Sequence, residues 1–281
     1  DGAHEIVFLK TLDDCMNEWG WKDIDFMKMD AEGHEEKIIV GGTRFFNSNS
    51  PLILYEIKAG DKINLGIADA FAALGYRSYR LIPGLNTLVP FNKSEQLDGY
   101  QLNLFCCKPD RADVLSRQGM LVDDPLPEKP GEPSSTNWLN YLEGFPFAKG
   151  LKDAWREYAR SQSTQPEWQV YESVLNSYAR AHNPVLSMPE RYNHLQRAYA
   201  RLAELLAKHA TLPRLMSFAR IASDLGKRAD AVQALHYLIG TPFPALSSWL
   251  HEPFLALADD FEPLDPGKNF SEWLKGHSRA V

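Results

Sequence analysis

The chain reads Ile24-Asp-Phe-Met-Lys28-Met-Asp30-Ala-Glu32-Gly33-His-Glu35 at residues 24–35, an apolar run that ends in a cluster of charges. Side chains alternate along a strand, so Lys28 and Asp30 are expected to project to the same side. Asp30 falls at the carboxyl end of this strand, the edge at which open α/β sheets place their ligands. Gly33 allows a sharp turn into a helix that begins near His34. This stretch therefore predicts a strand-to-helix unit with a charged rim.

A second predicted strand, Pro51–Ile57, also ends in a charge, because Glu56 stands near its carboxyl end. If the two strands are neighbours in the sheet, Asp30 and Glu56 lie close together at its rim. Two carboxylates placed in this way can bind a cation, share a proton, or accept a proton from a substrate hydroxyl.

A plainer interpretation of the same charges stays open. Asp30 and Glu32 can be helix-start carboxylates that the helix dipole favours, and Lys28 can be a strand residue that only reaches the rim. In that interpretation Glu35-Glu36-Lys37 form a solvated helix face. His34, at a helix start, is expected to be a surface residue rather than a ligand.

The first hundred residues alternate strand-like apolar runs with helical patterns, which is typical of crossover units and a mostly parallel sheet in an α/β fold. The connection over residues 83–100 holds no clear helix, which allows the last strand to run antiparallel. The expected strands are 6–9, 24–29, 51–57, 76–82 and 102–108, and the expected helices begin at Thr11 and span 34–46 and 61–74.

The composition changes from Pro109 onward, and residues 123–135 are rich in proline and polar side chains. Sequence of this kind favours an extended linker. We therefore expect an α/β domain over residues 1–108, a linker over 109–150 and an all-α helical domain over 151–281.

Helix-start signals are clear in the helical part. Pro166 stands at a first helical position, Ser187 and Glu190 form a capping box, and Thr211 opens the next helix. The two helices on either side of Leu225-Gly226 carry small residues where they would touch. This pair resembles one tetratricopeptide repeat, although only a single copy is evident.

Composition excludes several classes of protein. The net charge of −7 is uneven, since the first 150 residues carry −8, and an acidic half disfavours a nucleic-acid partner. No apolar run approaches the length of a membrane span, and no signal peptide precedes Asp1. Cys15, Cys106 and Cys107 lack disulfide or metal-ligand spacing, so we interpret them as buried apolar residues of a cytoplasmic, reducing environment.

A family resemblance rests on the order of these motifs. Thr11-Leu-Asp13, followed by the strand ending Lys28-Met-Asp30-Ala-Glu32-Gly33-His-Glu35, resembles the FkbM-type methyltransferase family. Gly41-Gly42 and the strand from Pro51 to Glu56 fit as well, so the resemblance spans about residues 7–108. It implies the carboxyl-terminal half of a class I, Rossmann-like methyltransferase domain. It also implies S-adenosyl-L-methionine as donor and, usually, O-methylation of a saccharide or another small hydroxylated acceptor.

The resemblance implies roles for the charged residues. Asp30 would touch the methionine end of the donor or the acceptor, and Ala31 and Glu32 would share in donor binding. Glu56 is the candidate base or acceptor-orienting group, and Lys28 tunes the charge of the two carboxylates. The resemblance assigns no metal-ligating residue.

One part of the family pattern is missing. The glycine-rich loop after the first strand and the acidic residue that holds the ribose have no counterpart, since Gly41-Gly42 ends a helix instead. These elements are expected before Asp1. The chain is therefore interpreted as a fragment that would be inactive alone.

Two alternatives remain. The helical domain can be an interaction module that binds a partner protein or a glycan, with the α/β part as scaffold. The carboxylates of Asp30, Glu32 and Glu56 can instead hold a metal ion, if they converge on one point.

Overall fold

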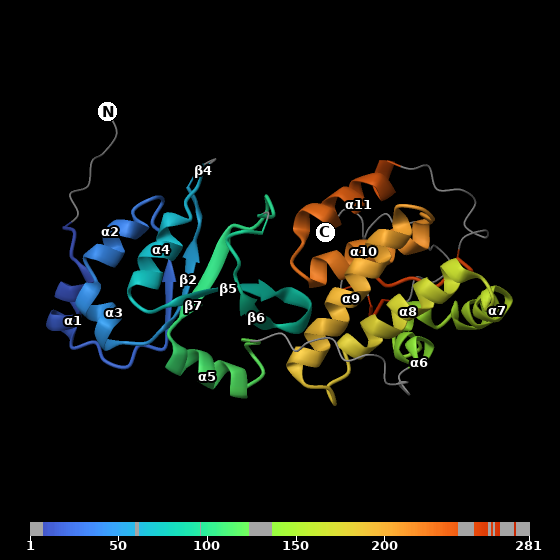
Figure 1. The fold of residues 1–281 in the computed structure, drawn as a ribbon, viewed down its shortest axis with the longest axis horizontal. Coiled ribbons are helices and arrows are strands. Elements are labelled where there is room, and N and C mark those ends of the chain that lie inside the picture. The colour runs from blue at the N-terminus through green and yellow to red at the C-terminus, as the bar shows by residue number, and fades with distance from the viewer. Residues whose placement is uncertain are drawn as a thin grey trace. The chain divides into compact units, whose positions relative to one another are not determined.

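The computed structural model describes residues 8–59, 62–95, 97–123, 137–240, 250–257, 260, 262–264 and 273, and the chain divides into two compact units (Figure 1). Unit 1 comprises residues 1–81, 87–97 and 101–123, and unit 2 comprises residues 82–86, 98–100 and 124–281. The predicted α/β class, with a helical region after it, is confirmed. None of the described helices is long and apolar enough to cross a membrane.

Unit 1 is built on a five-stranded sheet. Its strands lie in the order β1 (Phe26–Met29), β2 (Leu52–Glu56), β7 (Asn103–Cys107), β5 (Arg77–Ile82) and β6 (Thr87–Pro90). Two short strands, β3 (Lys58–Ala59) and β4 (Lys62–Ile63), form a separate antiparallel pair. The helices of this unit are α1 (Leu12–Trp19), α2 (Glu35–Val40), α3 (Thr43–Ser48), α4 (Gly66–Ala73) and α5 (Pro109–Arg117).

The strand directions are mixed. β1 and β2 are parallel, with Met29 opposite Tyr55, and the connection between them contains α2 and α3. β7 is last in the chain, lies between β2 and β5, and is antiparallel to both, so β1, β2 and β5 share one direction. The antiparallel last strand that the sequence allowed is therefore confirmed. A parallel arrangement needs a crossover connection, and residues 83–100 contain β6 and a single 3-10 turn instead.

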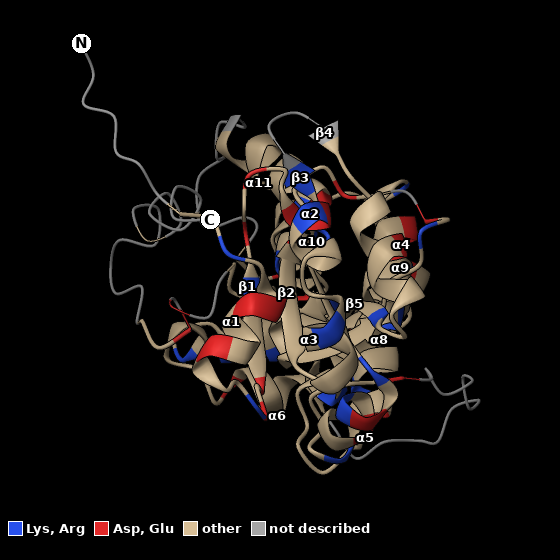
Figure 2. Ribbon diagram, turned by 90° about the vertical axis from the view of Figure 1, so that its left-hand side faces the viewer, with Lys and Arg blue, Asp and Glu red and all other residues tan. Residues whose placement is uncertain are grey.

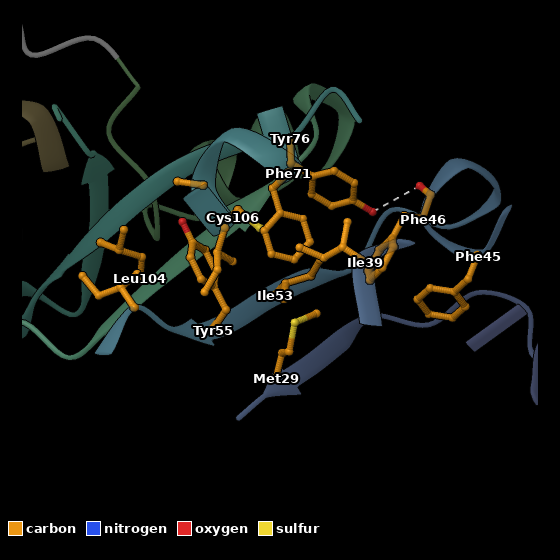
Figure 3. Packing of buried hydrophobic residues seen from close by; sticks show 13 residues of the cluster. Met29, Ile39, Phe45, Phe46, Ile53, Tyr55, Phe71, Tyr76, Leu104 and Cys106 are labelled. Carbon is orange, nitrogen blue, oxygen red and sulfur yellow. Dashed lines mark hydrogen bonds between the residues drawn. The ribbon is translucent and has the colours of Figure 1, made fainter. Parts of the chain in front are cut away.

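Helices cover both faces of this sheet. Figure 3 shows the larger core, in which Phe46 and Phe71 meet edge to face with their ring centroids 5.6 Å apart. The buried Tyr76 hydroxyl donates to the carbonyl of Phe46 at 3.3 Å, so its polar end is satisfied. The neighbours Cys106 and Cys107 belong to different clusters, as alternation along β7 requires. All three cysteines are buried and unpaired, as predicted.

Several predicted elements of unit 1 need correction. The helix expected over 34–46 is two helices, α2 and α3, because the chain bends at Gly41-Gly42. Gly42 lies so close to α1 that an added Cβ would stand 2.8 Å from Leu12 Cδ1. The helix expected over 61–74 is shorter, and α4 begins only at Gly66 because β4 precedes it.

Other differences lie at the ends of the unit. Of the strand expected over 6–9, residues 6 and 7 lie outside the described residues, and Phe8 and Leu9 are exposed and not in a strand. The linker expected over 109–150 begins with helix α5, which starts at Pro109 and buries Ala112 and Leu115 against the sheet. Residues 124–136 of that segment lie outside the described residues.

Unit 2 is helical in the residues that are described. Its helices are α6 (Trp138–Leu142), α7 (Lys152–Gln162), α8 (Pro166–Ala181), α9 (Met188–Leu206), α10 (Leu212–Asp224) and α11 (Arg228–Gly240). The start signals read from the sequence are confirmed: Pro166 is the first residue of α8, Ser187 and Glu190 form the capping box of α9, and Thr211 caps α10. The tetratricopeptide-like character of the last pair stays a prediction.

Residues 252–257 are buried in the core of unit 2 although they form no helix or strand. Tyr171, on α8, donates its hydroxyl to the carbonyl of Pro253 at 2.7 Å, and Ser217, on α10, accepts from the amide of Leu255 at 3.0 Å. A buried ion pair joins Arg220 and Asp224 within α10, with Arg220 Nε 3.0 Å from Asp224 Oδ2. Helices and segment are thus tied by hydrogen bonds as well as by apolar packing.

The side chain of Asp13 links α1 to the start of α3. Its carboxylate accepts from the amides of Phe45 at 2.8 Å and Arg44 at 3.2 Å, the first-turn donors of α3. Partial burial acts to raise the pKa of Asp13, but these hydrogen bonds and the Arg44 guanidinium outweigh it, so the pKa lies below its ordinary value. In Figure 2, α1 carries acidic residues in red and α3 a basic segment in blue.

We predict that Asp13→Ala destabilises unit 1 by about 1–2 kcal/mol at neutral pH, because the substitution leaves two helix-start amides without an acceptor. A lowered folded-state pKa gives stability that is present above the ordinary pKa of 3.8 and is lost as the pH falls through the folded-state value. The difference between wild type and variant should therefore persist at pH 6 and shrink below about pH 4.

Urea titration followed by hydrogen exchange in α3 measures this difference. Asp113→Ala is the matched control, since Asp113 is an exposed carboxylate on α5 and its loss should change stability by no more than about 0.5 kcal/mol. Equal stability of the Asp13→Ala variant and wild type at pH 6 would contradict the assignment.

Candidate functional site

The candidate site lies where β1 and β2 end side by side. The parallel register pairs Met29 with Tyr55, so the next residues along the two strands, Asp30 and Glu56, are also opposite each other. Their carboxyl groups lie close enough for each to shift the pKa of the other. The two strands are therefore neighbours in the sheet, which was the condition for the predicted pair. The two carboxyl groups lie close together at the rim.

Lys28 lies on the same side of β1 as Asp30. Its Nζ stands 2.8 Å from Asp30 Oδ2, in a pair whose side chains are 59% and 38% exposed. At that exposure the pair contributes little to stability because water screens it. Its consequence is electrostatic: the hydrogen bond and charge of Lys28 hold the pKa of Asp30 below its ordinary value.

Glu56 has the opposite shift. Desolvation raises its pKa above the ordinary value, and the hydrogen bond and negative charge of Asp30 raise it further. Glu32 and Glu35 add to the effect in the same direction. The two carboxyl groups are therefore unequal: Asp30 keeps its charge, and Glu56 holds a proton more readily. Unequal pKa values in a carboxyl pair are a common basis for assigning an acid and a base.

The turn after β1 is organised by Glu35. This side chain is 3% exposed, and its Oε1 accepts from the amides of Ala31 at 2.8 Å and Gly33 at 3.3 Å. Both residues at the centre of the turn have left-handed backbone, with φ of 51° at Glu32 and 92° at Gly33. A buried carboxylate that accepts two amides fixes the loop directly after Asp30.

The buried position of Glu35 differs from one interpretation of the sequence, and a signal in the sequence pointed to its role. The plainer interpretation of the charges had Glu35 on a solvated helix face with Glu36 and Lys37, whereas only Glu36 and Lys37 are exposed. The signal was the glycine two residues before it, since a left-handed turn leaves amides that need an acceptor. His34 is exposed, as predicted.

The remaining predicted site residues lie around the same turn. Ala31 is half-buried, and its amide is already used by Glu35. Glu32 is exposed, and its negative charge helps to raise the pKa of Glu56. Beside the turn lies an apolar groove of about 570 Å³, bordered by Ala31, His34 and residues 9–12 of the segment leading into α1. A groove of this size is large enough for a small ligand.

The described residues contain no group of three or more His, Cys, Asp or Glu side chains placed to hold a metal ion. Asp30 and Glu56 shift each other's pKa, and the charge of Glu32 raises the pKa of Glu56. The metal-enzyme alternative therefore gains no support from this arrangement.

Comparison with known proteins bears on part of the chain. Residues 2–78 match the model of the Methyltransferase FkbM domain, a segment that includes Asp13, Asp30 and Glu56. The match ends before β7, so it is shorter than the 7–108 resemblance that the motifs indicated, and it covers less than a third of the chain. No curated protein and no solved structure matches the chain. The matching domain model supports a methyltransferase relationship for the segment that carries the candidate site.

Proposed function

We propose that this chain takes part in methyl transfer from S-adenosyl-L-methionine to a hydroxyl group of a saccharide or another small hydroxylated acceptor. The observation that carries the proposal is the unequal carboxyl pair of Asp30 and Glu56 at the ends of two parallel strands, inside the segment that matches the FkbM domain. Such a pair offers one permanent negative charge and one group able to exchange a proton.

The residues at the rim fit the donor in part. The ionised, partly exposed carboxylate of Asp30 suits the cationic amino group at the methionine end of the donor. The amide of Ala31 does not suit a ligand, because it already donates to Glu35. We therefore assign donor contact to the side chain of Asp30, with Glu32 as the neighbouring exposed carboxylate.

Bound S-adenosyl-L-methionine supplies an electrophilic methyl group, and most of the enzyme's work is to align the acceptor with it. Lys28 keeps Asp30 charged. With donor bound, Glu56 would accept the proton of the acceptor hydroxyl as the hydroxyl oxygen bonds to the methyl carbon, so Glu56 would end protonated. The bond between that carbon and the donor sulfur would break in the same step, its electron pair staying on sulfur as a neutral thioether, and the acceptor would become a methyl ether. A base with a raised pKa suits this role better than an ordinary surface carboxylate.

We predict that Asp30→Asn lowers turnover of the full-length protein at least about tenfold while leaving its melting temperature nearly unchanged. The amide keeps the volume and removes the charge, and an exposed ion pair adds little stability. The measurement is a methyl-transfer assay together with thermal unfolding. Asp25→Asn is the matched control, because Asp25 lies at the opposite end of β1, 82% exposed, and pairs with Arg111. Wild-type turnover in Asp30→Asn would rule out a catalytic role.

A second prediction concerns pH. If ionised Glu56 is the base, kcat/KM should rise with pH through a pKa above the ordinary value of 4.5, because the protonated form cannot accept the hydroxyl proton. In Glu56→Gln the rate should fall and this acidic limb should disappear from the pH profile. Glu18→Gln, an exposed residue of α1, should keep the wild-type profile. An unchanged limb in Glu56→Gln would assign the proton transfer to another group.

A further inference from the structure

Unit 2 contains a pocket far in sequence from the carboxyl pair. It has a volume of about 340 Å³ and lies between the end of α7, the start of α8 and the turn that leads from α9 into α10. Tyr158 and Gln162 come from α7, Gln165 and Trp168 from the start of α8, and His209 and Thr211 from the turn. Its size is at the lower end of the range for small-molecule sites.

The base of the pocket is held by one arginine. Arg214 is almost completely buried and forms an ion pair with Glu252, with Nε 2.6 Å from Oε1. Its Nη1 donates to the carbonyl of His209 at 2.9 Å, and Tyr158 lines the same pocket. Arg214 lies over the ring of Tyr171, 5.3 Å from its centroid. One buried side chain therefore holds the turn that forms one wall of the pocket.

The charged groups around the pocket have partners. Glu252 neutralises Arg214, and Glu167 Oε1 faces His209 Nε2 at 3.5 Å. A small anion entering here would meet the carboxylate of Glu167 and a guanidinium that is already paired. A cation would meet Arg214 and His209. The lining therefore disfavours both kinds of ion.

The lining offers neutral hydrogen-bonding groups in their place. The side-chain amide of Gln165 makes no hydrogen bond to the described residues. Among the same residues, Gln162 Nε2 donates only to Ser161 Oγ, at 3.3 Å. Thr211 Oγ1 accepts from the amide of Arg214 at 3.3 Å, which leaves its hydroxyl hydrogen to donate. Amides and hydroxyls present donors and acceptors together, the combination that matches a ring of hydroxyl groups.

An aromatic wall completes the pocket. The rings of Tyr158 and Trp168 meet edge to face with centroids 5.3 Å apart. Trp168 is buried, and Tyr158 is half-buried and lines the opening. Apolar ring surface beside neutral polar groups suits the C–H face of a sugar, which is apolar while its rim is polar.

We propose that this pocket binds a neutral polyhydroxylated ligand, a mono- or disaccharide. The proposal does not depend on methyl transfer in unit 1. It assigns unit 2 a binding function of its own, by residues in α7, α8 and the α9–α10 turn.

The test is an NMR titration of the 281-residue chain with D-glucose, D-galactose and N-acetylglucosamine, observing the Trp168 indole and the His209 ring. At least one sugar should give saturable shifts at both reporters, with Kd on the order of millimolar. Inorganic phosphate and acetate should give none. Saturable binding of phosphate at the same reporters, or no saturation with any of the three sugars, would overturn the proposal.

Two variants locate the binding. Gln165→Ala should weaken sugar binding about tenfold, the effect of one lost hydrogen bond. Gln233→Ala, an exposed glutamine on α11 outside the pocket, is the matched control and should bind as wild type. Thr211→Val keeps the shape of the cap residue and should also weaken binding. Unchanged affinity in both Gln165→Ala and Thr211→Val would place the sugar elsewhere.

Discussion

The parallel pairing of β1 with β2 decides where every charged group of the candidate site lies. With Met29 opposite Tyr55, the residues that follow, Asp30 and Glu56, stand beside each other at the rim. A shift by one residue would turn Glu56 to the other face of the sheet and separate the pair. The register is itself fixed by burial, because Ile53 and Tyr55 are fully buried in the core under α2, α3 and α4. Hydrophobic packing therefore positions the polar site.

Two carboxylates, the buried Glu35 and the half-buried Asp13, hold the backbone around this pair. Glu35 accepts the amides of the turn that follows Asp30, so the loop cannot relax away from the rim. Asp13 accepts the first amides of α3 and thereby ties α1 to the helix layer that covers the strands. Each carboxylate satisfies backbone donors that would otherwise lack partners, and a buried donor without a partner is costly. The charges that stay exposed or partly exposed at the rim are Lys28, Asp30, Glu32 and Glu56, and these are available for ligand chemistry.

Sequence patterns identified the charged residues at the rim, but not the hydrogen bonds from backbone amides to Glu35 and Asp13 that hold the surrounding backbone. Alternation along 24–29 was enough to put Lys28 and Asp30 on one side, and strand ends were enough to suggest Glu56 as their neighbour. The role of Glu35 was missed because it depends on the left-handed backbone at Glu32 and Gly33. The spacing of apolar residues in a helix does not reveal the sign of φ in the turn before it. The break between α2 and α3 was missed for a related reason: it arises from the close approach of Gly42 to Leu12, a contact between segments thirty residues apart. Caps such as Ser187 with Glu190 were found because they are local.

We infer that Asp30 and Glu56 act as one pair, in which each carboxyl group shifts the pKa of the other. The most direct measurement is the pKa of Glu56 by carboxyl ¹³C NMR, in wild type and in Asp30→Asn. We predict that the pKa of Glu56 lies above 4.5 in wild type, and that it falls toward 4.5 in the variant because the neighbouring negative charge is gone, with the part due to desolvation remaining. A Glu56 pKa that is the same in both proteins would contradict the coupling and, with it, the assignment of an acid and a base at this rim.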